Sequence, residues 1–213
     1  MNLKAYHDDP QVKEKYVTRM KNHIKADELI HGEGWDGKRG CAVGCTLDRY
    51  DHACYQNELG LPEWLARLED TIFENMSKEK SKTFPLLLLE AIPVGVDLQK
   101  TFHKFQIFVL ELAKKHVEKK YSSIIKIIDD VIDLHLKSAN GMLIDDSAWS
   151  AARSAAESAA RSAARSAAES AARSAAESAA RSAAESAAWS AAWSAAFDEM
   201  ADKLIELLKE AEN

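Results

Sequence analysis

The sequence predicts an all-α protein, with a compact multi-helix body over residues 1–144 and a long Ala-rich helix over residues 145–213. Two observations favour this class. In the body, apolar residues recur at the helical period between capping and breaking residues, and few segments show the alternation of strands. In residues 150–196, the tripeptide Ser-Ala-Ala and one variable residue repeat without interruption, and alanine is the best helix former.

The body begins with a helix that Asp9 and Pro10 are expected to start, Asp9 as the N-cap and Pro10 as the first helical residue. The segment from Gln11 to His31 contains no breaker before Gly32, so one helix is predicted over it. The stretch "GEGWDGKRG" follows, and its four glycines in nine residues predict a loop rather than regular structure. This loop leads directly into the cysteine-containing stretch "RGCAVGCTLDRYDHAC".

Four more helices are predicted in the body. One runs from Pro62 through about Met76, and a short one lies within "FPLLLLEAIPVG". A third is capped by Asp97, and a fourth is capped by Ser122 or Ser123 and stops at Asn140-Gly141.

The repeat is predicted to form one continuous helix from about Asp146 into the amphipathic tail "DEMADKLIELLKEAE". Each four-residue step turns the variable position by roughly 40° around the helix, so its charges wind around the axis and form no ordinary coiled-coil seam. Near the end, Trp189, Trp193 and Phe197 approach the stripe of Met200 and Leu204, which predicts that this end packs against the body.

Charge and hydropathy exclude several classes of protein. The formal net charge is −6, and the 28 basic and 34 acidic residues are mixed along the chain, so no nucleic-acid partner is expected. The longest apolar run is too short and interrupted to span a membrane, and the first residues lack the apolar core of a signal peptide, so a cytoplasmic protein without a membrane partner is expected. The three cysteines are then expected to be reduced thiols.

Four residues of the cysteine stretch have the spacing C-x3-C-x6-H-x-C and could ligate a metal: Cys41, Cys45, His52 and Cys54. Sulfur and imidazole ligands in this number suit tetrahedral zinc, the cofactor that such a site would hold. The spacing fits the usual pairs of zinc ligands poorly. Buried thiols that only pack inside a glycine-ordered turn are therefore the competing interpretation.

The same residues also allow a nucleophile. A thiol at a helix N-terminus beside an imidazole has a lowered pKa. Cys45 would be the nucleophile, His52 its base and Asp51 the orienting group, although His31 or His7 could equally serve as the base.

A third candidate site lies along the first predicted helix, where His23, Asp27 and His31 are four residues apart and would share one side. These three, with Trp35 of the glycine loop, are the predicted ligand-binding residues. The competing interpretation is a polar flank beside the helix's apolar stripe, with His31 near its end.

The stretches "GCAVGCT" and "ELGLPEWLARLED" resemble a family of uncharacterised bacterial and phage-borne proteins, and the resemblance covers about the first third of the chain. It implies no activity, cofactor or functional residue.

The site residues favour a metal-binding or small-ligand-binding helical protein, which could be an enzyme. The alternative is a non-catalytic protein that associates with itself or with a partner through the Ala-rich helix, with the cysteines as packing groups.

Overall fold

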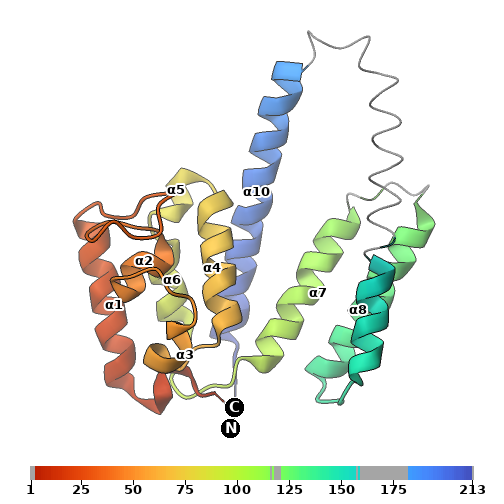
Figure 1. The fold of residues 1–213 in the computed structure, drawn as a ribbon, viewed down its shortest axis with the longest axis horizontal. Coiled ribbons are helices and arrows are strands. Elements are labelled where there is room, and N and C mark those ends of the chain that lie inside the picture. Colours follow the sequence, from red (N-terminus) through yellow and green to blue (C-terminus); the bar gives the residue numbers. More distant parts are fainter. Residues whose placement is uncertain (1–2, 116, 118–120, 157, 159–181, 213) are drawn as a thin grey trace. The chain divides into compact units, whose positions relative to one another are not determined.

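All regular elements in the described part of the chain are helices, as the computed structural model in Figure 1 shows. The structure describes residues 3–115, 117, 121–156, 158 and 182–212. Within these ranges, the only β-type pairings are two isolated bridges in the glycine loop. The predicted all-α class is confirmed. None of the described helices is both long enough and apolar enough to cross a membrane.

The chain divides into two compact units. The first consists of Met1–Thr101 together with Ser190–Asn213, and the second of Phe102–Trp189. The boundary predicted after residue 144 therefore falls inside the second unit.

The first unit begins with a tight turn at Ala5–Asp8 and helix α1 (Pro10–Lys25). The predicted cap is confirmed, because the Asp9 carboxylate accepts a hydrogen bond from the Gln11 N–H at 2.8 Å. The predicted extension of this helix to His31 is wrong. Asp27 adopts a left-handed conformation with φ of 56°, and the Glu28 N–H returns to the His23 carbonyl in a helix-ending Schellman motif.

Two short helices that the sequence analysis did not predict, α2 (Ala42–Leu47) and α3 (Cys54–Leu59), lie within and after the cysteine stretch. The chain before α2 folds onto itself. The Gly40 N–H donates to the Glu28 carbonyl at 3.1 Å, and the Cys41 N–H donates to the Glu33 carbonyl at 2.9 Å. The loop from Glu28 to Cys41 is thus held by its own backbone.

Helices α4 (Glu63–Asn75), α5 (Lys78–Ser81) and α6 (Phe84–Ala91) complete the N-terminal part of this unit. The helices predicted from Pro62 and within "FPLLLLEAIPVG" are confirmed. Helix α1 packs against α2 and α6, and α2 packs against α4. The largest fully buried side chains between these elements are Tyr6, Tyr16, Tyr55, Phe73 and Phe84.

The last part of α10 (Ser182–Lys209) belongs to the first unit. Phe197, Leu204 and Leu208 are buried, and the Trp193 indole N–H donates to the Asn75 side-chain oxygen at 3.2 Å. The prediction that this end packs against the body is confirmed. Residues 159–181 of the predicted continuous helix lie outside the described residues.

The described part of the second unit contains α7 (Gln99–Lys115) from Phe102 onward, α8 (Ser122–Ala139), a helical segment at residues 146–156 and the beginning of α10. The Asp97 carboxylate caps α7 through the Gln99 N–H, as predicted. Tyr121, which makes no side-chain capping bond, takes the N-cap position of α8 that was predicted for a serine.

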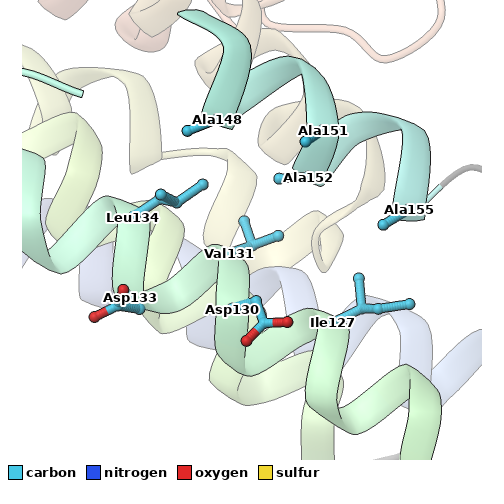
Figure 2. A pocket seen from close by; sticks show the side chains of 9 residues that line it. All are labelled: Ile127, Asp130, Val131, Asp133, Leu134, Ala148, Ala151, Ala152 and Ala155. Carbon is cyan, nitrogen blue, oxygen red and sulfur yellow. The ribbon is translucent and has the colours of Figure 1, made fainter. Parts of the chain in front are cut away.

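An open groove of about 390 Å³ lies between α8 and residues 146–156. Figure 2 shows alanines of the helical segment facing longer side chains of α8 across it. The lining residues are Ile127, Asp130, Val131, Asp133, Leu134, Ala148, Ala151, Ala152 and Ala155. Because alanine offers little surface, these two helices bury little apolar area along the groove.

Gly44 sits where α2 passes the glycine loop, and a Cβ atom there would overlap the Gly34 carbonyl oxygen. We expect Gly44→Ala to lower the free energy of unfolding by about 2 kcal/mol, although alanine normally stabilises a helix. Denaturation by urea, followed by circular dichroism, measures the change. Lys25→Ala, at the exposed end of α1, is the control; equal stability of the two variants would contradict the close contact.

Glu69 of α4 is fully buried, and burial raises its pKa to about 8 although the Tyr55 hydroxyl donates to its carboxylate at 2.6 Å. In the unfolded chain this carboxyl group ionises as the pH rises through its ordinary pKa of 4.5, whereas in the folded protein it stays protonated up to about pH 8. The contribution of Glu69 to the free energy of unfolding is therefore complete below pH 4.5 and is lost as the pH rises toward 8. The loss is up to about 1.4 kcal/mol for each pH unit.

We therefore expect Glu69→Gln to flatten this dependence and to be more stable than the wild type at pH 8. Urea denaturation of the full chain at pH 5.0, 6.5 and 8.0 measures the free energy of unfolding of the wild type and the variant. Glu79→Gln on the surface of α5 is the matched control, and a Glu69→Gln profile parallel to the wild type would contradict a protonated Glu69.

Candidate metal site

Three potential metal ligands meet at one edge of the first unit: Cys41, Asp70 and Glu74. One ligand atom from each, the Cys41 sulfur and one carboxylate oxygen of each acid, lies within 4.8 Å of the others. In the described part of the chain, no other group of three or more histidine, cysteine or acidic side chains is as close.

Cys41 is the residue that precedes α2, and its side chain is 1% exposed. Its position depends on the backbone bonds of the loop from Glu28 to Cys41 and on the close passage of Gly34 past Gly40 and Gly44. Asp70 and Glu74 are four residues apart on α4, so they project from the same side of that helix over one turn.

Asp70 is held by two donors from the chain that follows α2. The Tyr50 hydroxyl donates to Oδ2 at 2.8 Å, and His52 Nε2 lies 3.1 Å from the same oxygen. The other carboxylate oxygen, Oδ1, is buried and has no hydrogen-bond partner. The Cys41 thiol also interacts with the Asp70 carboxylate. A buried carboxylate oxygen without a strong donor is costly, so a cation beside this atom would stabilise it.

Glu74 is more accessible than Asp70, with side-chain exposures of 28% and 16%. Its Oε2 accepts a hydrogen bond from the Gly32 N–H at 2.7 Å and lies 3.9 Å from His31 Nδ1. The His31 ring is fixed in turn, because it stacks on Phe73 and its Nε2 lies 2.8 Å from the Ser81 hydroxyl. Solvent therefore reaches the site more easily beside Glu74 than beside Asp70.

Burial strongly raises the pKa of the Cys41 thiol, and the neighbouring Asp70 carboxylate raises it further. Asp70 also raises the pKa of Tyr50 to about 12 through the hydrogen bond between them. The Asp70 carboxylate therefore contributes negative charge beside both groups. A cation at the site would offset this charge.

The predicted set of four zinc ligands is not brought together, because each cysteine has different partners. Cys41 joins Asp70 and Glu74, whereas the Cys45 thiol faces the Glu28 and Gly40 carbonyls at 3.6 and 3.5 Å. The Cys54 thiol donates to the Asp51 carboxylate at 3.2 Å.

The predicted arrangement of Cys45, His52 and Asp51 as a nucleophile, base and orienting group is also not formed. His52 contacts Asp70, and Asp51 contacts Cys54. Cys45 lies inside α2, and burial raises the pKa of its thiol to about 12. A buried thiol with a raised pKa is the opposite of the thiolate that nucleophilic attack requires.

Of the predicted ligand-binding residues, His23 and Trp35 are in contact, whereas Asp27 and His31 have other surroundings because α1 ends at Lys25. His23 lies between two carboxylates, with Nδ1 2.7 Å from Glu28 and Nε2 3.0 Å from Asp48, and its ring contacts Trp35 edge-on. Asp27 is exposed. His31 instead belongs to the edge of the Cys41 site.

The sequence analysis missed Asp70, Glu74 and Tyr50. The available signal was the spacing of Asp70 and Glu74 by one turn on a helix that was itself predicted. Acidic pairs at this spacing are common on exposed helix faces, so the spacing alone does not distinguish a site.

Comparisons with protein-family models, curated proteins and solved structures give no match for this chain.

The three thiols differ in accessibility, which predicts their reactivity in the native protein. Cys54 is partly exposed, whereas Cys41 and Cys45 are buried. We expect a disulfide reagent to modify one thiol at least about tenfold faster than the others. Cys54→Ser should remove the fast phase and Cys45→Ser should keep it; two thiols reacting together would contradict the structure.

Proposed function

We propose that this protein binds a divalent transition-metal ion through Cys41, Asp70 and Glu74, with zinc as the ion that fits best. The observation that carries the proposal is the convergence of one thiol and two carboxylates within 4.8 Å, with a buried, unpartnered oxygen on Asp70.

The ligand types favour zinc over the common hard cations. Magnesium and calcium prefer six or more oxygen ligands, whereas zinc accepts sulfur and carboxylate oxygen together in a four-coordinate site. The Cys41 thiol would lose its proton on binding and become the sulfur ligand. Three protein ligands leave a fourth position for water or a small ligand, which is the arrangement of zinc sites that do chemistry.

The surrounding charges support a cation at this position. Among the described residues, the ion-pair partners of Asp70 and Glu74 are His52 and His31 and not a permanently charged Lys or Arg. Two carboxylates beside a buried thiol are therefore incompletely compensated. A bound divalent ion would supply the missing positive charge.

His52 and Tyr50 would position Asp70 rather than ligate the metal. Both donate to Oδ2, which leaves Oδ1 for the ion. Outer-shell partners of this kind orient the ligand, and their loss typically weakens metal binding by about 10–100-fold.

Zinc titration of the full-length, chelator-treated protein, in competition with a chromophoric chelator, tests the proposal. We expect one equivalent of tightly bound zinc. Cys41→Ser and Glu74→Gln should each weaken binding by at least about 100-fold, and His52→Gln by about tenfold, because they remove ligands and a positioning group respectively.

Cys45→Ser is the matched control, since it removes a buried thiol of the same helix that lies outside the cluster. It should bind zinc as the wild type does. No stoichiometric zinc, or equal binding by Cys41→Ser and Cys45→Ser, would refute the site. Circular dichroism of each variant identifies a loss of folding, and Glu74→Gln, on the accessible side, provides a test that does not disturb the buried thiol.

The alternative function, assembly through the Ala-rich helix, rests on a segment that includes residues 159–181, which the structure does not describe. It stays a prediction.

A further inference from the structure

Two histidines of the second unit form a buried pair that the metal-site proposal does not use. His103 of α7 and His135 of α8 are each 8% exposed, and their Nδ1 atoms are 2.9 Å apart. At this distance one Nδ1 must carry a proton and the other must accept it. The pair is therefore a hydrogen bond between two imidazoles that joins two helices.

Aromatic rings from the same unit enclose the pair. Trp149, from the helical residues 146–156, lies edge-on to the His135 ring at 4.8 Å and parallel to the His103 ring at 6.3 Å. Phe102 lies 5.3 Å from His103 and 6.1 Å from His135. Helices α7 and α8 and residues 146–156 thus meet at this cluster.

Beyond Trp149, residues 146–156 present mainly alanines to α8. The two helices face one another there across the alanine-lined groove of about 390 Å³. Alanine buries little surface, so the ring cluster supplies a large share of what holds residues 146–156 in place.

Among the described residues, no acidic side chain pairs with either histidine. Burial lowers the pKa of both histidines, and burial together with His103 lowers that of His135 to about 4. In the described part of the unit, no carboxylate contributes to either shift. Two acids close to the pair in sequence have other partners: Asp133 pairs with Lys137 at 2.5 Å, and Asp145 accepts from the Ser147 N–H at 2.7 Å. The other charged residues closest along the three helices are Lys100, Lys104, Asp146 and Arg153.

Protonation acts on the hydrogen bond in two steps. A first proton can enter at Nε2 of the donor ring and leave the bond intact, although it places a charge in an apolar cluster. A second proton makes both Nδ1 atoms donors, and the bond cannot form. Unfolded histidines take up protons near pH 6.5, so stability is complete above that pH and falls as pH drops.

We propose that the His103–His135 pair is an acid-sensitive latch: proton uptake by the pair separates α8 and residues 146–156 from α7, while the first unit stays folded.

Hydrogen exchange of the full-length protein at pH 7.5 and pH 5.0, analysed by mass spectrometry and corrected for the chemical exchange rate, tests the latch. At pH 5.0 most carboxylates remain ionised, so the histidines are the main groups that change. We expect protection of residues 122–139 and 146–156 to fall about tenfold at pH 5.0, with α4 unchanged or better protected.

The double variant His103→Phe/His135→Phe keeps two rings and should lose this response, whereas His7→Phe in the first unit should keep it. Should the double variant be unprotected already at pH 7.5, NMR titration of the wild-type imidazoles decides. Apparent pKa values of the pair well below 6.5 support the latch. Titration of both rings near 6.5, or unchanged protection at pH 5.0, overturns it.

Discussion

The close passage of the Gly34 carbonyl past Gly40 and Gly44 is the constraint on which the first unit's functional edge depends. Because no Cβ atom can occupy these positions, the loop lies directly against the start of α2 and its backbone bonds close around Cys41. The glycines that remove regular structure from this segment therefore give it a defined shape. The contact thereby helps to place the Cys41 thiol beside Asp70 and Glu74 of α4.

Helix α4 places two neighbouring acidic side chains, Glu69 and Asp70, in different environments. Successive residues of a helix point about 100° apart, so Glu69 enters the core beside Tyr55 while Asp70 reaches the edge beside Tyr50 and His52. Burial keeps Glu69 protonated at neutral pH, whereas Asp70 has two donors on one oxygen and none on the other. The metal binding proposed for this edge depends on the Asp70 oxygen that has no donor.

The interactions that stabilise the first unit internally differ from those that stabilise the second. The first has a core of buried aromatic and aliphatic side chains and backbone-directed bonds, such as those of Lys13 Nζ to the Glu90 and Ile92 carbonyls at the end of α6. The second has a cluster of imidazole, indole and phenyl rings and an alanine-lined groove. Apolar burial is insensitive to pH and imidazole pairing is not, so the stabilities of the units are expected to respond differently to acid.

The sequence by itself determined the helical class and those helix starts and ends that depend on neighbouring residues. Asp9 and Asp97 cap the helices that they were predicted to cap, and the apolar period of α4 places it correctly. These features are local, so a short stretch of residues is sufficient to specify them. The end of α1 was not predicted, although it too is local. Asp27 adopts the left-handed conformation that usually belongs to glycine, so no glycine marks the end of the helix in the sequence.

Only the tertiary structure decided which residues form the site. Cys41, Asp70 and Glu74 come from separate segments, and their proximity depends on how α2 packs against α4. The spacing of the cysteines is a property of the local chain. It cannot specify which groups each thiol faces after α2 and α3 have packed, and in the folded protein Cys41, Cys45 and Cys54 have different partners.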